Sequence, residues 1–291
     1  MVAIVQNPLR SRPPLRLASA EPSSAAEAEA TIRVHNLSIV FDTPRGQVIA
    51  VDRISFNVSQ GEFVSIVGPS GCGKSTVLNT LAGLETPFEG EVLVDGRPLT
   101  SPRPEIGMVF QQPHLFPWKS VRKNIAHGPR ARGKSAAEAR QIADGLIEMI
   151  GLTKFAAAYP HTLSGGMQQR VAIARALANQ PRVLLMDEPF GALDAQTRAV
   201  MQDNLLELRG RINATVVFVT HDIDEAILLS DRVVIMSAGP GRILRDLRID
   251  LPRPRSNAIL TEAGYLALKK ECLDLIRAEG LRAFNQMGEA G

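Results

Sequence analysis

This sequence of 291 residues has no long apolar run, only two cysteines and little excess of one charge over the other. No segment approaches the roughly 18 consecutive apolar residues that a membrane-spanning helix requires. Prolines interrupt the N-terminal segment, which lacks the apolar stretch of a secretory signal. We therefore expect neither a membrane span nor a cleaved leader in this chain.

The two cysteines, Cys72 and Cys272, are too few for a disulfide framework or a zinc site, and they favour a reducing, cytoplasmic setting. The net charge of +3, from 33 basic and 30 acidic residues, is too small to indicate a nucleic-acid-binding face. Hydrophobic residues make up 45% of the chain, which is enough to bury the core of one large domain or two modest ones.

Prolines and a low-complexity run of small and acidic residues predict a disordered tail over residues 1–30. Several β-rich runs follow from Thr31, separated by turn residues that include Glu89-Gly90 and Asp95-Gly96. Predicted helices and strands then alternate, which is typical of a parallel sheet flanked by helices. The helices are expected at 135–150, 167–178, 195–210, 222–229 and about 259–278, and the strands at 182–187, 215–219 and 232–236. The apolar stripe of the first helix is predicted to contain Ala139, Ile142, Leu146 and Ile150.

The strongest motif is GPSGCGKST, which fits the phosphate-loop pattern G-x-x-x-x-G-K-[ST] between a predicted strand and a predicted helix. Its glycines let backbone N–H groups cradle phosphate oxygens. Lys74 can reach the β- and γ-phosphates, and the Ser75 hydroxyl can hold Mg²⁺. The predicted nucleotide-binding residues are Gly68, Pro69, Ser70, Gly71, Cys72, Gly73, Lys74, Ser75 and Thr76. Cys72 is interpreted as a filler residue, with reaction with thiol reagents as the alternative.

Two acids follow a buried strand in RVLLMDEP, at the sheet edge where α/β proteins place their ligands. With a phosphate loop upstream, the pair predicts a division of roles. Asp187 would hold Mg²⁺ and Glu188 would polarise the attacking water. By itself, the same pair is explained equally well by a helix N-cap.

A second anion-binding loop is predicted at LSGGMQQR, where Ser164, Gly165 and Gly166 precede a helix. One nucleotide does not need two such loops from one subunit. A head-to-tail dimer would use them together, with the phosphate loop of one subunit facing the second loop of its mate.

These motifs resemble the ATP-binding subunits of ABC transporters, and the resemblance covers about residues 31–240. LSGGMQQR matches the signature of that family. The resemblance implies that Gln111 senses Mg²⁺ and the attacking water, that the loop ending at Asp194 crosses the dimer interface, and that His221 contacts the γ-phosphate. It also implies that Phe41 stacks on adenine, although a phenylalanine in a strand is more often part of the core.

The fold that the resemblance implies is an α/β P-loop NTPase core with a parallel sheet, an N-terminal antiparallel β subdomain and a helical insertion at about 112–170. The ATPase domain is expected to span residues 31–250, and residues 251–291 to form a C-terminal helical extension. ATP and Mg²⁺ are the expected cofactors, and a homodimer or a paired ATPase subunit is the expected assembly.

The segment 110–125 is similar to importer subunits, in which this loop contacts an integral-membrane permease. Leu115, Phe116 and Trp118 form its apolar patch, with core packing of Trp118 as the alternative. Residues 221–243 and 250–255 are similar to the nitrate, sulfonate and taurine importer branch. The resemblance implies a peripheral protein at the cytoplasmic face of the inner membrane that serves a periplasmic solute-binding protein indirectly, with no nucleic-acid partner.

Two other functions stay open at this point: an ABC exporter ATPase, and a soluble ABC-type ATPase that acts on DNA or ribosomes. The solute is open as well, among nitrate, taurine, alkanesulfonates, bicarbonate and pyrimidines.

Between 119 and 134 the chain also has basic residues and no acid, which favours either a surface near anionic headgroups or an ordinary solvated face. These residues are Lys119, Arg122, Lys123, Arg130, Arg132 and Lys134.

Overall fold

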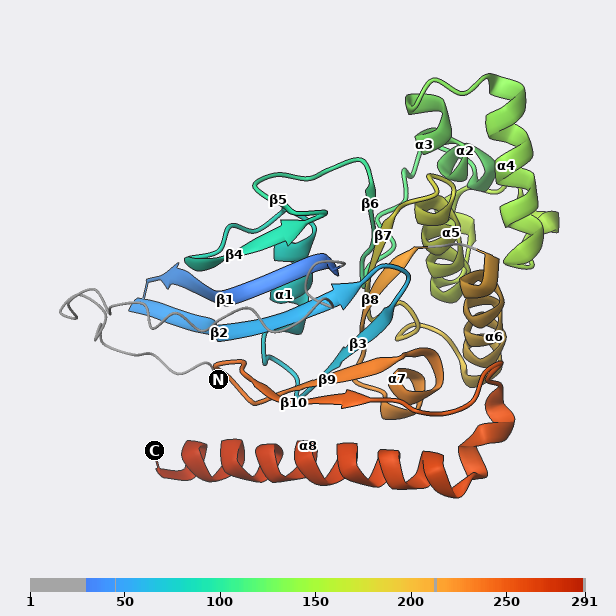
Figure 1. The fold of residues 1–291 in the computed structure, drawn as a ribbon. Helices are drawn as coiled ribbons and strands as arrows, with labels where there is room; N and C mark the ends of the chain where they lie inside the picture. The colour runs from blue at the N-terminus through green and yellow to red at the C-terminus, as the bar shows by residue number, and fades with distance from the viewer. Residues whose placement is uncertain (1–29, 45, 212–213, 290–291) are drawn as a thin grey trace.

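The computed structural model describes residues 30–44, 46–211 and 214–289 (Figure 1), so the tail predicted for residues 1–30 lies outside the described residues except for Ala30. The elements alternate as the sequence predicts after an opening section of strands. In chain order they are β1 (Ala30–Thr43), β2 (Gly46–Ser59), β3 (Phe63–Val67), α1 (Lys74–Leu81), β4 (Glu89–Val94), β5 (Arg97–Pro98), β6 (Ile106–Val109), α2 (Val121–Ile125), α3 (His127–Ala131), α4 (Ala136–Met149), η2 (Thr153–Phe155), η3 (Pro160–Thr162), α5 (Gly165–Leu177), β7 (Val183–Asp187), α6 (Ala195–Arg211), β8 (Thr215–Val219), α7 (Ile223–Leu229), β9 (Arg232–Met236), β10 (Ile243–Arg248), η4 (Asn257–Thr261) and α8 (Ala263–Glu289).

Two sheets make up the framework. The first is antiparallel with the strand order β2-β1-β4-β5, and the second has the order β10-β9-β3-β8-β7-β6. In the second sheet only β10 runs antiparallel to its neighbour. Strands β3, β7 and β8 are buried at every position, because a parallel sheet is covered on both faces. The predicted α/β class with an antiparallel β part is therefore confirmed.

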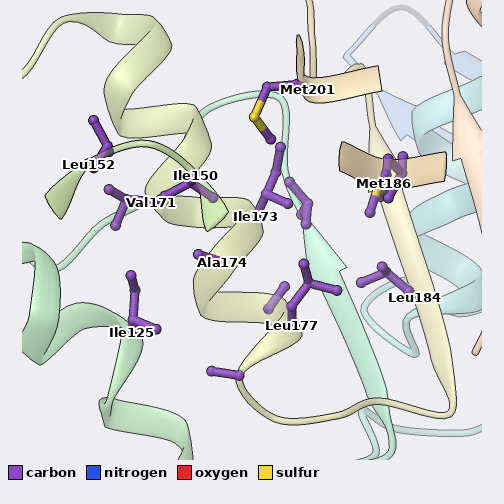
Figure 2. Close-up of a cluster of buried hydrophobic side chains, with 14 of the residues drawn as sticks. Ile125, Ile150, Leu152, Val171, Ile173, Ala174, Leu177, Leu184, Met186 and Met201 are labelled. Carbon is purple, nitrogen blue, oxygen red and sulfur yellow. The ribbon is translucent and has the colours of Figure 1, made fainter. Parts of the chain in front are cut away.

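The apolar core lies on both faces of the second sheet. On one face, side chains of β1, β2, β4 and α1 pack against it in a single cluster. On the other face, Ile173 and Leu177 of α5 pack with Leu184 and Met186 of β7 (Figure 2). Ile125 of α2 joins the same cluster, so the helices at the far end of the molecule share a core with the sheet.

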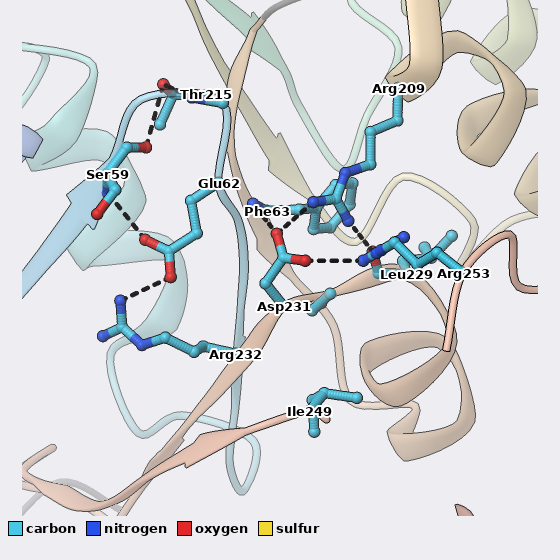
Figure 3. Close-up of polar contacts among 12 residues, drawn as sticks. Ser59, Glu62, Phe63, Arg209, Thr215, Leu229, Asp231, Arg232, Ile249 and Arg253 are labelled. Atoms are coloured by element: carbon cyan, nitrogen blue, oxygen red, sulfur yellow. Dashed lines mark hydrogen bonds and ion pairs between the residues drawn. The ribbon is translucent and has the colours of Figure 1, made fainter. Parts of the chain in front are cut away.

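A third cluster joins α7, β9 and β10 to α8, which runs beneath them in Figure 1. The chain leading to α8 is held by an ion-pair network around Asp231 (Figure 3). Asp231 accepts hydrogen bonds from the backbone N–H of Phe63 at 2.9 Å, from Arg253 at 2.9 Å and from Arg209. These contacts fix the segment after β10 against the edge of the second sheet.

Two details of the sequence prediction are wrong. Glu89-Gly90 is no turn but the start of β4, where Gly90 (φ +84°) lets the backbone of β1 approach so closely that a Cβ would lie 2.3 Å from the Asn36 carbonyl oxygen. The last helix begins at Ala263 rather than 259, because a 3₁₀ turn at 257–261 and an extended residue precede it.

The predicted stripe of α4 faces the core. Ala139 and Ile150 are buried, and the half-buried Ile142 and Leu146 pack against the core cluster together with the buried Ala143 and Ile147. Among the described residues, every helix is too short or too polar to span a bilayer.

Candidate active site

The phosphate loop connects β3 to α1, as its sequence context predicts. Gly73, directly before the helix, has φ +95°, and a Cβ there would lie 2.8 Å from Val51 Cγ2. Gly71 also has a positive φ, of +77°. A residue with a side chain at position 73 would have a strained backbone and would be crowded. The tight curve of the loop therefore requires glycine at this position.

Lys74 is buried within this loop. Its Nζ donates hydrogen bonds to the carbonyl oxygens of Gly68 at 2.8 Å and Pro69 at 3.0 Å. The ammonium thus sits inside the loop with its donors directed to neutral oxygens, a position from which it can turn to an anionic one. Cys72 Sγ lies 3.9 Å from the same Nζ, and burial raises the pKa of this thiol, which fits its interpretation as a filler residue.

Ser75 and Asp187 meet across the space between α1 and the end of β7. Ser75 Oγ donates a hydrogen bond to Asp187 Oδ1 at 2.9 Å. Asp187 is buried, and burial, assisted by the nearby Glu188 charge, raises the pKa of its carboxyl group, although the Ser75 hydrogen bond opposes the shift. A desolvated carboxylate next to a hydroxyl is a pair of hard oxygen ligands of the kind that Mg²⁺ prefers.

We expect Asp187→Asn to raise the thermal unfolding midpoint of the nucleotide-free protein at pH 8 by about 2–4 °C. Asparagine still accepts the Ser75 hydrogen bond but removes a charge whose burial costs free energy. Since the folded-state pKa of Asp187 lies above its unfolded value, the wild type loses stability as the pH rises through that folded-state pKa. The gain should therefore shrink toward acidic pH. Thermal unfolding at several pH values checks this, with the exposed Asp203→Asn as the control.

Glu188, Gln111 and His221 converge although they follow three different strands. His221 Nδ1 lies 3.0 Å from Glu188 Oε2, and Gln111 Nε2 lies 3.5 Å from the same oxygen. They come together because β6, β7 and β8 are parallel neighbours, so their carboxyl ends share one edge of the sheet. The arrangement places one carboxylate oxygen where it can bind a water proton, beside Asp187.

The backbone at Glu188 is unusual. Its φ of +42° lies in the left-handed region, which is uncommon for a residue with a Cβ and often marks a functional position. The Glu188 N–H donates to the Val219 carbonyl oxygen at 2.9 Å, which anchors the turn to β8. This turn aims the Glu188 side chain at His221.

Sequence reasoning missed the residues that support His221. Thr220 Oγ1 donates to the buried Glu225 Oε2 at 2.7 Å, and Arg198 Nε lies 3.7 Å from Glu225 Oε1. Asp222 caps α7 by accepting hydrogen bonds from the N–H groups of Asp224 and Glu225. The acidic run HDIDE was the available signal, because an Asp three residues before a second acid is typical of a helix start.

The signature loop opens α5, as expected. Ser164 is the N-cap and its Oγ accepts a hydrogen bond from the Met167 N–H at 3.3 Å. A Cβ on Gly166 would lie 3.1 Å from Leu193 Cδ2, which places the signature beside the loop that ends at Asp194. Among the described residues, no hydrogen bond joins positions 164–166 to positions 68–76.

Gln169, which the sequence analysis did not single out, links the signature helix to the Gln111 loop. Its side chain is buried, and Nε2 donates to the Phe110 carbonyl oxygen at 3.1 Å. Asp194, at the end of the loop beside the signature, caps α6 by accepting a hydrogen bond from the Thr197 N–H at 2.9 Å. That hydrogen bond lowers the pKa of Asp194.

Phe41 is not a core residue. It lies on β1 opposite Val48 of β2 and is 36% exposed, which leaves the ring face accessible. Trp118 is 70% exposed, so the core-packing alternative is wrong for it, whereas Leu115 and Phe116 are half-buried. The Trp118 ring leans on Phe116, with centroids 5.7 Å apart.

The basic segment 119–134 is not a uniform free face. Arg122 pairs with Asp144, and Arg132 donates to the carbonyl oxygens of Asn179 and Pro104. Lys119 lies over the Phe116 ring, 4.4 Å from its centroid. These contacts tie part of the positive charge into the fold of the helical region.

Comparison with known proteins decides the family. A family model described as ABC transporter matches residues 51–191. A nitrate import ATP-binding protein of Synechococcus elongatus is 46% identical over 240 residues, which cover 81% of this chain and 88% of that protein. An aliphatic sulfonates import ATP-binding protein of Bacillus cereus is 44% identical over 251 residues, which cover 86% of this chain and 98% of that protein. The chain belongs to the ABC transporter ATP-binding family.

A solved ABC cassette has the same architecture. The dimeric structure of an ATP-binding cassette in a post-hydrolysis state, bound to ADP and Pi, matches with a TM-score of 0.70 and 35% identity, and covers 76% of this chain and 100% of that one. The ABC ATPase fold and the family predicted from the ordered motifs are thereby confirmed. This cassette is an ATPase.

Proposed function

We propose that this cassette is the ATP-hydrolysing subunit of an ABC importer, and that Glu188 is the residue that activates water. The observation that carries the proposal is the meeting of Gln111 and His221 at one oxygen of Glu188, next to the Ser75–Asp187 pair. Phosphoryl transfer needs positioning and charge stabilisation more than covalent chemistry, and these residues supply both.

The residues divide into groups by what each can hold. Residues 68–76 would cradle the phosphates with Lys74, and Phe41 would stack on adenine, for which its exposed ring is suited. Glu188 would accept the water proton, Gln111 would orient the water, and His221 would donate to the γ-phosphate, since its side chain is 63% exposed.

Mg²⁺ fits the chemistry of the residues present. The Ser75 hydroxyl and the Asp187 carboxylate offer two hard oxygens 2.9 Å apart, and phosphates and waters would complete the shell, which is how Mg²⁺ is usually held. Gln111 would add a further oxygen near this pair. When bound, the ion neutralises phosphate charge; the residues of the chain hold it and aim the water.

Two copies of the cassette would form the working unit, with Ser164, Gly165 and Gly166 of one facing the phosphate loop of the other. The dimeric state of the related solved cassette supports this arrangement. Asp194, exposed beside the signature, would lie at the junction. We also propose that residues 31–250 form the ATPase domain, with a helical subdomain at about 112–170, and that 251–291 form an extension.

The importer assignment and the solute class draw on two relatives named as nitrate and aliphatic sulfonate import proteins. We propose a peripheral position at the cytoplasmic face of the cell membrane, a permease partner, and a small anion such as nitrate or a sulfonate as the solute. Purification of the tagged full-length chain from membranes tests this. Co-purification of a polytopic permease supports import, whereas ribosomes or DNA in its place would contradict the proposal. Vesicle uptake assays would separate an importer from an exporter.

Trp118→Ala should weaken binding to the permease by about tenfold, because exposed aromatic residues often dominate interface energies. The side chain is largely exposed and rests on Phe116, so its loss should leave the fold and the basal ATPase rate unchanged. Quantitative co-purification with the permease measures the effect. The matched control is Val200→Ala, because Val200 is also exposed and apolar but lies on α6, away from Trp118 in the sequence. Undiminished permease binding would contradict the docking role of Trp118.

A further inference from the structure

The C-terminal helix α8 makes a specific polar contact with the helix that follows His221. Tyr265 is 1% exposed, and its hydroxyl donates a hydrogen bond to Asp224 Oδ1 at 2.5 Å. One turn further along α8, Lys269 Nζ lies 2.7 Å from Oδ1 and 2.9 Å from Oδ2 of the same carboxylate. Asp224 therefore has both oxygens bound by residues of α8, in a charge-assisted pair of the stronger kind.

Asp224 lies in the first turn of α7, three residues after His221. The start of that helix is rigid, because Asp222 Oδ1 accepts from the N–H groups of Asp224 at 2.8 Å and Glu225 at 3.2 Å. A displacement of Asp224 is therefore transmitted to the His221 backbone. His221 Nδ1 lies 3.0 Å from Glu188 Oε2, so a shift of the His221 backbone by a fraction of an ångström would change this contact.

The other end of α7 is also held from the C-terminal region. The buried Arg255 donates to the carbonyl oxygens of Ile227 at 3.0 Å and Ser230 at 2.5 Å, where α7 ends. The same guanidinium reaches the Ile249 carbonyl oxygen at 2.8 Å. Arg255 satisfies carbonyl groups that a helix end leaves without partners, and so it fixes α7 along its axis.

Further along α8, Glu279 extends the contact toward the phosphate loop. Its buried carboxylate accepts a hydrogen bond from the Ala238 N–H at 3.3 Å. The loop containing Ala238 packs on the phosphate loop so closely that a Cβ on Gly241 would lie 2.1 Å from the Cys72 carbonyl oxygen. Helix α8 thus contacts both α7 and the loop that packs on the phosphate loop, and Figure 1 shows it running beneath β9, β10 and α7.

We propose that Tyr265 and Lys269 are positioning residues for ATP hydrolysis, which hold Asp224, and through α7 hold His221, at its distance from Glu188. The inference rests on the proposed role of His221 at the γ-phosphate. It assigns a function to the C-terminal extension: by contacting both, α8 couples the position of the His221 loop to that of the phosphate loop.

The test uses the full-length protein with Tyr265→Phe and Lys269→Met, singly and together. Phenylalanine keeps the ring that packs in the α7–α8 cluster, and methionine keeps the unbranched stem, so the two changes remove polar contacts alone. We expect kcat to fall about fivefold in the double variant while KM for ATP changes less than about twofold, because the contact acts on the chemical step and not on binding. Lys269→Arg should restore most of the rate.

A background variant separates positioning from loss of structure. In His221→Ala, followed by single-turnover kinetics, the double change should have no further effect, since residues that act through one another are not additive. Lys270→Met is the matched control, because Lys270 is exposed and its ion pair among the described residues is with Asp274 of its own helix. It should leave kcat unchanged.

Two results would overturn the inference: a wild-type kcat in the double variant, or the same fractional fall in the His221→Ala background. If the double variant fails to fold, Lys269→Met alone decides, because this side chain is partly exposed and its loss spares the core. A wild-type rate in His221→Ala by itself would instead refute the proposed function of the site, and the present inference with it.

Discussion

Glu188→Gln should lower the steady-state rate of ATP hydrolysis by a factor of about 10²–10⁴, the range expected for loss of a general base. Glutamine has nearly the same shape, and its amide oxygen can still accept from His221 Nδ1, which lies 3.0 Å away in the wild type. It cannot take a proton from water. Release of inorganic phosphate measures the rate.

ATP should still bind to the Glu188→Gln variant, because the proposed phosphate contacts would come from the loop before α1 and not from Glu188. Without hydrolysis to separate them, two subunits should stay together, and size-exclusion chromatography with ATP should show a stable dimer. The control is Glu148→Gln on the exposed side of α4, which should hydrolyse ATP normally. Hydrolysis by Glu188→Gln at the wild-type rate would show that Glu188 is not the base.

Lys74→Ala should weaken ATP binding itself, by about 10²-fold, as expected when charge-assisted hydrogen bonds to phosphate are lost. In the structure, Lys74 Nζ donates to two carbonyl oxygens of its own loop, so the ammonium is already held at the place where phosphates would enter. Fluorescence titration with a labelled ATP analogue measures the affinity.

Two comparisons make the Lys74 result interpretable. Lys74→Met retains the buried stem and tests whether the loop merely loosens, and thermal unfolding without nucleotide reports the cost of losing the internal hydrogen bonds. Lys123→Ala, exposed on α2, is the control for a general loss of positive charge. A normal affinity for ATP in both Lys74 variants would mean that the loop binds phosphate without its lysine.

The alternation of helices and strands was predictable because its causes are local. Buried strands such as β7 and β8 are short apolar runs bounded by turn residues, and the phosphate loop is defined by glycines at fixed spacing. Errors occurred where a distant segment decides the backbone. Gly90 looked like a turn residue, but it is there because β1 approaches β4 closely.

The active-site residues were only partly predictable. Ser75 and Asp187 follow from motifs that each carry their own structural context, and the structure places them 2.9 Å apart. The roles given to Gln111 and His221 came from resemblance, because nothing next to either residue in the sequence indicates a catalytic group. Gln169 was missed for the same reason, since its importance lies in a contact with Phe110, far along the chain. Glu225 was missed although HDIDE indicates a helix start, because that signal does not show its contacts with Thr220 and Arg198.

By itself, then, the sequence determined the phosphate loop, the acidic pair at the end of β7, the α/β class and the family. The phosphate loop and the acidic pair each depend on residues within a few positions of one another, and the class and the family follow from the order of such local patterns along the chain. Only the tertiary structure decided that Gln111, Glu188 and His221 share one oxygen, that Trp118 is exposed, and that α8 reaches Asp224. The physical reason is that a parallel sheet brings the ends of separate strands to one edge. A helix near the end of the chain, such as α8, contacts residues that are far from it in the sequence, so its partners are set by the folded surface on which it packs.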